Sequence, residues 1–468
     1  MTHASLARPV AALALAAAAA AAPALAQGTF PTTPPPIGTP KAFKVPGRRT
    51  IVLANGMKVS LIPFGTVPKA TVRLVIRTGS IDESADQVWL AALMTDYLSE
   101  GTTTRSARDV AEEAAGMGGG LAVGGGSDVV NLTADVLGEN AAAMVRLEAD
   151  VARHPKFAET ELARLKSNRL RTLAIARSQS QAQANARFLE LMYPDHPYGR
   201  LYPTEAQLQG YTVDQVRAFW AANVGAARAH LYVTGVFDAA AVERAAREAF
   251  GDWTAGAPPT VKPATQPVQR KVAVIDRPNA VQSTIYVGLA VPNDHSADYT
   301  KLLVTDAILG GTFGSRITSN IREKKGYTYS PGSFISQRKG IAHWNEVADV
   351  TTNVTGPALQ EIFNEVDRLR TEAPPLEELD RIKRNMAGIF VLQNGSRGGV
   401  GGQYVTVDLQ GHDDAWLRAY LDRVLAVTPA DVQETMQKYL VPDRMTLVVV
   451  GDRKVIDEQL KPYTATVP

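Results

Sequence analysis

The stretch Thr212-Val-Asp-Gln-Val216, which leads into His230-Leu-Tyr-Val-Thr-Gly235, occurs a second time as Thr428-Pro-Ala-Asp-Val432 followed by Thr446-Leu-Val-Val-Val-Gly451. In both copies a helical pattern precedes an apolar strand, and the second copy follows the first at an offset of 216 positions. Self-similarity at one fixed spacing indicates a tandem duplication. The sequence therefore predicts two related halves.

Each half begins with a strand that alternates between apolar and polar residues, the period-2 pattern of a half-buried strand. The apolar positions are Val72, Leu74 and Ile76 in one half, and Ile285, Val287 and Leu289 in the other. Ser84-Ala-Asp86 recurs as Ser296-Ala-Asp298 after these strands and before a long apolar helix. Strands and helices mixed in this way favour an α+β fold. We expect each half to be a mostly antiparallel sheet with helices on one face, and the two halves to be related by a pseudo-two-fold.

The composition is that of an ordinary globular protein, with 468 residues, 45% of them hydrophobic, and a net charge of +2. A chain of this length should form at least two domains. The charge balance gives no global field for nucleic acid or an anionic membrane. The absence of cysteine excludes a disulfide framework and a Cys-ligated metal.

The N-terminus has the pattern of a secretory signal peptide over residues 1–26. Arg8 precedes an alanine- and leucine-rich run, and Ala24-Leu25-Ala26 fits a cleavage site before Gln27. The alternative is a membrane anchor, but the apolar run is too short to span a bilayer. We expect a secreted protein of the bacterial periplasm.

Proline-rich segments divide the remainder. Residues 27–46 are predicted to form an extended tether, and residues 254–267, with four prolines, a linker. These breaks leave two domains, at 47–253 and 268–468.

A capping-box pattern, Ser84-x-x-Gln87, predicts the start of a helix whose apolar stripe runs through Leu90, Leu93 and Leu98 to a stop at Gly101. Together with Gly79-Ser80-x-x-Glu83 before it and Gly101-Thr102 after it, this helix resembles the entry to the pitrilysin and insulinase family of zinc peptidases. The resemblance covers nearly the whole mature chain. It implies one half of a peptidase clamshell, similar to the α-subunit type of mitochondrial processing peptidase and to bacterial heterodimeric homologues.

Members of that family carry His-x-x-Glu-His on this helix, ending six residues before the threonine. Counting back from Thr102 places the motif on Ala92-Leu93-Met94-Thr95-Asp96. The resemblance places the third zinc ligand at Thr172, within a register uncertain by one helical turn, and the nearest acids, Glu159 and Glu161, come too early. Zinc catalysis needs three ligands and an open position for water, and threonine is no general base near neutral pH. We therefore expect no metal in this chain.

No two of its histidines are close enough in sequence to form a local ligand pair. His343-x-x-Glu346 is the only His/acid spacing that suggests ligands, but it lies in a segment that alternates like a strand. We interpret it as structural.

Arg322 and Tyr329 are the candidate substrate-binding residues. They lie in Ile321-Arg322-Glu-Lys-Lys-Gly326-Tyr-Thr-Tyr329, and the family resemblance implies that both reach over the substrate backbone beside the scissile bond. A guanidinium can bind a peptide carbonyl, and a phenol can donate to the oxyanion of a tetrahedral intermediate. The alternative is structural: Arg322 would be a cation at a helix end stopped by Gly326, and Tyr329 a half-buried strand residue.

Two further segments match or imitate known patterns. Asp195-His196-Pro197-Tyr198-Gly199 is similar to a common loop of the family. The glycine runs 118–120 and 124–126 lack the Lys-Ser/Thr of a phosphate loop. We expect these glycines to shape a turn and to permit close backbone approach, with peptide pairing at the neighbouring strand edge as a weaker hypothesis.

These observations predict a non-proteolytic partner of a catalytic, zinc-binding subunit of the same family, contributing to peptide hydrolysis. The zinc is expected in that partner, and neither nucleic acid nor a membrane is expected as a ligand. The alternative is an inert scaffold or assembly protein of the same fold. A self-sufficient metallopeptidase would need ligands that the sequence lacks.

Overall fold

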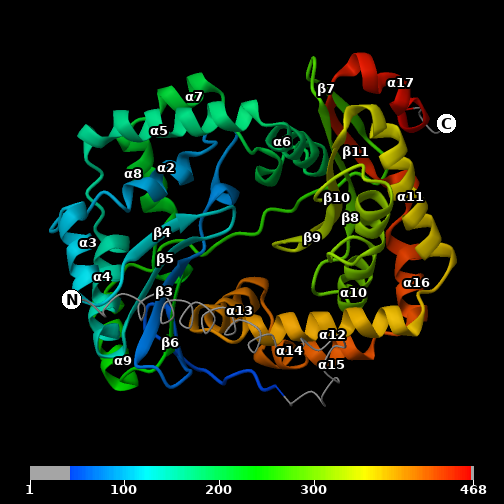
Figure 1. Cartoon of the computed structure of the whole chain (residues 1–468). Coiled ribbons are helices and arrows are strands. Elements are labelled where there is room, and N and C mark those ends of the chain that lie inside the picture. The colour runs from blue at the N-terminus through cyan, green and yellow to red at the C-terminus, as the bar shows by residue number, and fades with distance from the viewer. Residues whose placement is uncertain (1–42, 465–468) are drawn as a thin grey trace, which may run out of the picture. The chain divides into compact units, whose positions relative to one another are not determined.

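Two mixed β-sheets, each built from one half of the chain, organise the computed structural model, which describes residues 43–464 (Figure 1). Of these, residues 44–464 belong to one compact unit. The predicted signal peptide, 1–26, and nearly all of the predicted tether lie outside the described residues. No helix among residues 43–464 combines the length and the apolar character that crossing a membrane requires.

The first sheet has the strand order β1-β2-β6-β3-β5-β4. Only β2 and β6 run parallel; the other neighbours are antiparallel. The strands are β1 (Arg49–Val52), β2 (Lys58–Pro63), β3 (Lys69–Ile76), β4 (Leu121–Gly125), β5 (Val130–Leu137) and β6 (Ala229–Gly235). Val72, Leu74 and Ile76 of β3 face the main core, as their alternation predicts.

The second sheet has the order β7-β11-β8-β10-β9, again with one parallel pair, β7 and β11. Its strands are β7 (Val272–Asp276), β8 (Gln282–Val291), β9 (Gly332–Arg338), β10 (Ile341–Thr351) and β11 (Thr446–Gly451). With β1 set aside, the two orders are identical when strands are matched in chain order. The predicted pair of similar α+β halves is confirmed.

Helices of each half cover one face of that half's own sheet, because their apolar stripes join the core formed by the alternating strand residues. In the first half these helices are α2 (Leu90–Tyr97), α3 (Ala107–Gly116), α4 (Ala141–Arg153), α8 (Val213–Asn223) and α9 (Ala239–Phe250). In the second half they are α10 (Tyr299–Leu309), α11 (Thr355–Thr371), α16 (Pro429–Tyr439) and α17 (Arg453–Thr464).

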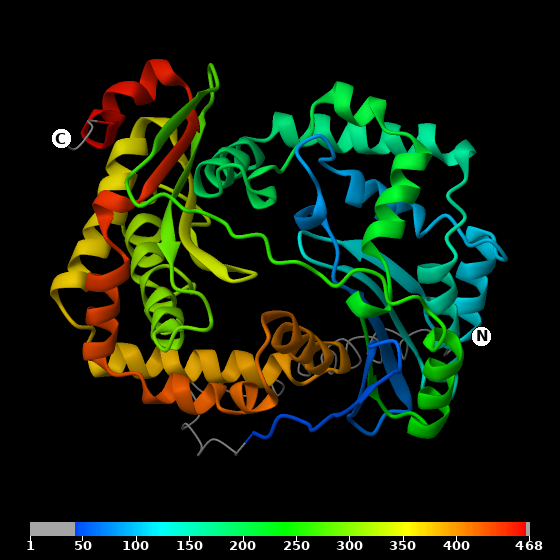
Figure 2. The same cartoon turned by 180° about the vertical axis from the view of Figure 1, so that it is seen from behind.

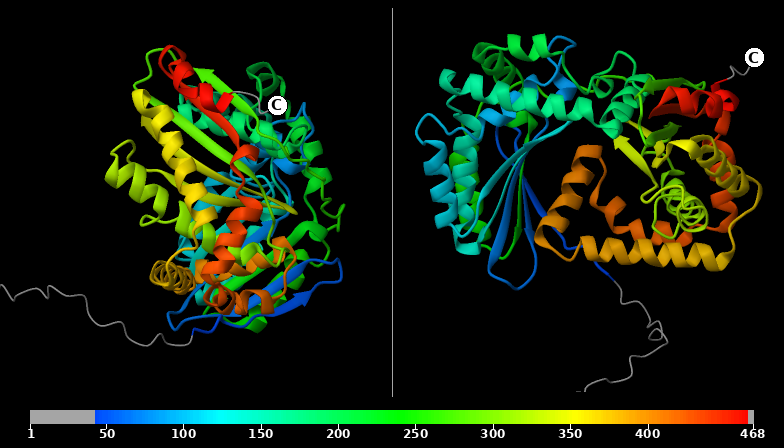
Figure 3. Two further views of the ribbon diagram at one scale, coloured as in Figure 1. Left: turned by 90° about the vertical axis from the view of Figure 1, so that its right-hand side faces the viewer. Right: turned by 45° about the horizontal axis from the view of Figure 1, so that its top comes forward.

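The opposite face of each sheet is covered by a helix from the other half. The helix α6 (Ser180–Met192), reached through α5 (Glu159–Ser178), packs on Tyr286, Val448 and Val450 of the second sheet. In return α13 (Arg397–Gln410), reached through α12 (Leu376–Gln393), packs on β3 and β6. This exchange can be followed in Figure 2 and in the right-hand view of Figure 3. Reciprocal placement of equivalent helices is what a pseudo-two-fold relation between the halves produces.

The contact of α13 with the first sheet is close and polar. A Cβ atom added to Gly401 would lie 2.9 Å from Thr234 Oγ1, so glycine permits the approach. Asp408 accepts hydrogen bonds from Tyr232 Oη at 2.7 Å and from Arg48 at 2.5 and 2.9 Å. His230 lies in the same network, and burial lowers its pKa to about 3.

The helix α2 does not begin where its capping box predicts. Ser84 N does donate to Gln87 Oε1 at 3.2 Å, but this bond closes a turn. The helix starts at Leu90, after Trp89 in a left-handed conformation with φ of 71°. The helix also ends earlier than predicted, at Tyr97 with Leu98 as its C-cap. Gly101, with φ of +92°, lies four residues beyond Tyr97.

Candidate functional site

The positions that correspond to the zinc motif lie on one face of α2, and an arginine covers that face. Arg169 of α5 donates from Nε and Nη2 to the two oxygens of Asp96, both at 2.7 Å. Its Nη2 also donates to the carbonyl of Ala92 at 3.0 Å. The guanidinium therefore bridges the first and last positions of the degenerate motif with a bidentate pair, the strongest geometry for this type of contact.

The residues present do not fit a zinc ion. Asp96 is the only ligand-type side chain of the motif, and its oxygens already bind a cation, while Ala92 has no ligand atom. Thr95 Oγ1 donates to the carbonyl of Ala91 at 2.8 Å, within its own helix. A metal there would also face the permanent positive charge of Arg169.

The helix α5 meets α2 through Arg169 and not through the predicted third position. Thr172 is exposed, and its hydroxyl donates to the carbonyl of Asn168 at 3.1 Å. Arg169 lies one helical turn earlier, within the expected error of the register. Glu159 and Glu161 lie in the first turn of α5, where Glu161 pairs with Arg164 at 2.9 Å.

A hollow of about 310 Å³ lies beside this face, lined by Glu83, Ala92, Thr95 and Gly125 among others. A Cβ atom at Gly125 would lie 2.7 Å from Thr95 Oγ1, so the end of β4 reaches α2 because the residue is glycine. Gly119 makes a similar approach, 1.8 Å from its added Cβ to the carbonyl oxygen of Asp135. Both contacts agree with the expected role of these glycines. The strand β4 is the edge of its sheet, and peptide pairing there stays a prediction.

The side chain of Glu83, from the loop before α2, reaches the first turn of the helix and caps it in place of the predicted capping box. Its carboxylate accepts from Ala91 N at 2.8 Å, while only 2% of the residue is exposed. Burial raises the pKa of Glu83 to about 7, against the lowering effect of hydrogen bonds from the backbone of Ala91 and Trp89.

Arg322 and Tyr329 line a separate open groove of about 570 Å³ in the second half. The Arg322 guanidinium lies over two aromatic rings, 4.4 Å from the centroid of Phe313 and 4.9 Å from that of Tyr329. Tyr329 is 79% exposed and Phe313 72% exposed. The structural alternative for Tyr329, a half-buried strand residue, is therefore wrong, because Tyr329 precedes β9 and faces solvent.

Arg322 also fits its structural alternative in part. It lies in a π-helical segment, Thr318–Lys324, and the chain turns at Gly326 with φ of +66°. Gly326 N donates to the carbonyl of Arg322 at 3.1 Å. The groove of Arg322 shares no lining residue with the hollow beside α2. Both predicted substrate-binding residues thus lie away from the degenerate motif of their own chain, and their role stays a prediction.

His343 and Glu346 do not form a ligand pair, because they point to opposite faces of β10. His343 Nδ1 lies 2.7 Å from Tyr193 Oη on the face covered by α6. Glu346 is buried on the other face, where burial, and then the nearby Asp306, raise its pKa.

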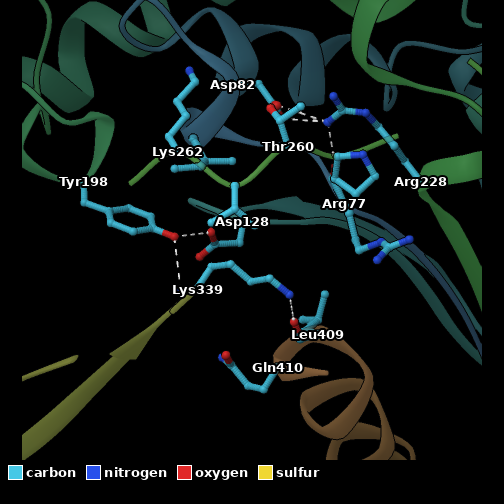
Figure 4. A pocket seen from close by; sticks show the side chains of 13 residues that line it. Arg77, Asp82, Asp128, Tyr198, Arg228, Thr260, Lys262, Lys339, Leu409 and Gln410 are labelled. Atoms are coloured by element: carbon cyan, nitrogen blue, oxygen red, sulfur yellow. Dashed lines mark hydrogen bonds and ion pairs between the residues drawn. The ribbon is translucent and has the colours of Figure 1, made fainter. Parts of the chain in front are cut away.

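The loop 195–199 contributes to a pocket of about 200 Å³ that both halves and the linker line (Figure 4). Tyr198 Oη donates to Asp128 Oδ1 at 2.6 Å and accepts from Lys339 N at 3.3 Å. The buried pair Asp82–Arg228, at 3.0 Å, lies on the other side of this pocket in Figure 4. The loop thus links the first half to the β9–β10 hairpin of the second half.

Comparisons with known proteins agree with the fold described above. An "Uncharacterized zinc protease" of Rickettsia bellii is 24% identical over 332 residues, which cover 71% of this chain and 80% of the relative. A peptidase M16 inactive domain from Pseudomonas fluorescens has a similar structure, with a TM-score of 0.78, 22% identity, and coverage of 86% of this chain and 98% of that chain. A chain of Complex III2 from Candida albicans, Inz-5 bound, superposes with a TM-score of 0.74 at 15% identity, covering 88% and 99% of the two chains.

Two family models match consecutive parts of the chain. Residues 61–202 match Insulinase (Peptidase family M16), and residues 210–386 match the Peptidase M16 inactive domain. The first match contains α2 with its degenerate motif, and the second contains Arg322 and Tyr329. The chain belongs to the insulinase family, peptidase family M16.

Proposed function

We propose that this chain is the non-proteolytic partner subunit of a zinc metallopeptidase of the insulinase family, and that it acts in the bacterial periplasm. The observation that carries the proposal is the contact of Arg169 with Asp96 and Ala92, which fills the face where a catalytic metal would bind. The proteolytic zinc then belongs to a second subunit with an intact His-x-x-Glu-His motif.

The exposure of Arg322 and Tyr329 supports a role at an interface with that subunit. Exposed apolar patches that are rimmed by polar residues often mark interaction sites, and Phe313 and Tyr329 are both exposed beside Arg322. Stacking on Phe313 and Tyr329 orients the Arg322 guanidinium before a peptide arrives. In a complex, Arg322 would hold a peptide carbonyl, and the Tyr329 hydroxyl would donate to the oxyanion of the tetrahedral intermediate.

The first test uses the chain alone, incubated with unfolded peptides and with added zinc. We expect no cleavage, because no described residue pair of α2 and α5 provides the ligands and base of the family motif. Zinc-dependent proteolysis that a chelator abolishes would contradict the proposal.

The second test uses a complex of this chain with a family member that carries the intact His-x-x-Glu-His motif. Tyr329→Phe should lower turnover on the order of 100-fold, because one oxyanion donor is lost, and should weaken peptide binding less. Arg322→Ala should weaken peptide binding as well. Tyr439→Phe and Arg368→Ala, on α16 and α11, are matched controls and should leave both quantities unchanged.

The likeness to a chain of Complex III2 favours a second candidate, an inert scaffold of the same fold. The same kinetics separate the two. If size exclusion shows an intact complex while Tyr329→Phe and Arg322→Ala both retain full turnover, the scaffold role replaces the substrate-binding role.

A further inference from the structure

Three metal-ligating side chains meet where α13 ends, outside the hollows described above. Asp294, His295 and His412 offer ligand atoms that all lie within 4.8 Å of one another. Asp294 and His295 lie in the loop after β8. His412 directly follows Gly411, whose φ of +82° turns the chain at the end of α13.

His412 presents a buried nitrogen without a hydrogen bond. Its Nε2 lies 3.0 Å from Asp294 Oδ2, yet no hydrogen bond reaches this nitrogen from any of residues 43–464. The side chain is 9% exposed and stacks on Trp416 at 4.1 Å between centroids. The nitrogen thus faces a carboxylate oxygen at close range without a hydrogen bond between them, and an ion held by both atoms would satisfy both. Two ligands of one tetrahedral zinc, each about 2.0 Å from the ion, lie roughly 3.3 Å apart, close to the distance seen here.

The other two side chains carry the outer contacts of metal ligands. His295 Nε2 lies 2.9 Å from the carbonyl oxygen of Gln410, which can only accept, so Nε2 carries the proton and Nδ1 the free lone pair. A backbone carbonyl on the second nitrogen is the usual support of a metal-bound histidine. Asp294 Oδ1 accepts from Gln337 Nε2 at 2.9 Å, which leaves Oδ2 for an ion.

We propose that Asp294, His295 and His412 bind one divalent transition-metal ion, with zinc as the reference case and solvent as the fourth ligand. Two imidazoles and one carboxylate suit zinc, cobalt or nickel and not magnesium or calcium, which prefer all-oxygen sites. Tetrahedral ligands lie roughly 3.3 Å apart, so from a spacing within 4.8 Å the exposed His295 ring would move by at most about 1.5 Å to reach the ion.

This site differs from the family's zinc site in position and in consequence. It lies in the second half, and no general base for peptide hydrolysis belongs to it. An ion there would tie the loop after β8 to the end of α13, the helix that covers the first sheet. It also departs from the expectation that the chain holds no metal, which rested on the ligands missing at Ala92, Asp96 and Thr172 and on the wide sequence separation of the histidines.

The experiment is calorimetric titration of the chelator-treated chain with zinc at pH 7.5, with magnesium as the negative probe, and the visible spectrum of the cobalt-loaded chain. We expect one zinc per chain with micromolar or tighter affinity, and a thermal midpoint that rises when zinc is added. His412→Ala should weaken zinc binding more than roughly 100-fold, since loss of mere supporting contacts already costs 10- to 100-fold.

The matched control is His154→Ala. His154 Nδ1 lies 3.1 Å from Asp150 on α4, an Asp–His pair without a second histidine, and its removal should leave binding unchanged. Asp294→Asn, which keeps the side-chain shape, serves if His412→Ala folds poorly, and should weaken binding in the same direction. Absence of saturable one-to-one binding, retention of full affinity in Asp294→Asn, or equal loss in His154→Ala would overturn the proposal. Zinc binding without proteolysis would leave the proposed function intact.

Discussion

Replacing Glu83 with Gln should stabilise the protein at alkaline pH, because the buried Glu83 carboxylate is hard to ionise. Burial raises its pKa from 4.5 to about 7. Above pH 4.5 the unfolded chain releases this proton while the folded chain keeps it, so the free energy of unfolding falls as the pH rises to about 7 and is constant above that. At 1.36 kcal/mol per pH unit, the full penalty is about 3 kcal/mol.

The assay is urea unfolding at pH 5, 6.5 and 8 for the wild type, Glu83→Gln and the control Glu159→Gln, whose carboxylate is exposed on α5. Between pH 5 and 8 the wild type should lose about 2–3 kcal/mol relative to Glu83→Gln. Other buried acids, such as Asp306 with a pKa of about 6, act in all variants and cancel in the comparison. Glutamine retains an oxygen that can accept from Ala91 N. If the curves of Glu83→Gln and the wild type run parallel, Glu83 is already ionised in the fold and the reasoning fails.

Asp82→Ala should destabilise the protein by about 3–5 kcal/mol in thermal unfolding, because it leaves the Arg228 guanidinium, 5% exposed, without its carboxylate; Asp214→Ala, from an exposed pair, should change stability by less than about 1 kcal/mol. Arg169→Ala should lower the free energy of unfolding by about 1–3 kcal/mol, because Asp96 loses both charge-assisted hydrogen bonds. The variant should show no zinc-dependent proteolysis. Cleavage by it would mean that Arg169 only blocks a functional zinc site. Gly401→Val should lower the free energy of unfolding by about 1–3 kcal/mol, because the added side chain collides with Thr234. Gly388→Val on α12 is the control for helix propensity, since an added Cβ atom there meets nothing within 4 Å.

The repeat within the sequence predicted the fold well, because the fixed offset and the alternation of apolar residues are local signals. The exchange of α6 and α13 was not predictable from them. An apolar stripe such as that of Phe188, Leu189 and Met192 indicates that a helix is buried, but not which sheet buries it. The start of α2 was misplaced for a related reason, since the group that caps it, Glu83, lies before the predicted box and reaches Ala91 through the fold.

The candidate sites were likewise predictable only where the residues that form them lie close together in the sequence. The loss of ligands at Ala92 and Asp96 is visible in the sequence because the motif is local. The only feature of the sequence that could have identified Arg169 is its position one helical turn before Thr172 on the same helix. The pairing of His295 with His412 carried none, because the loop after β8 and the end of α13 come together only in the folded second half.

The exchanged helices impose an order on folding during synthesis. The first sheet is complete once β6 emerges, yet α13, which covers its polar face, is made 162 residues after Gly235. At 5–20 residues per second this gap lasts roughly 10–30 s. The apolar face of α6 waits longer still, until β11 is made near the end of the chain. Nascent chains of this protein should therefore expose the apolar face of α6 and one uncovered face of the first sheet at the same time. Chaperones that hold unfolded chains bind such exposed apolar surfaces. A chain truncated before α13 should be degraded or aggregate, and should not persist as a stable half-sized domain.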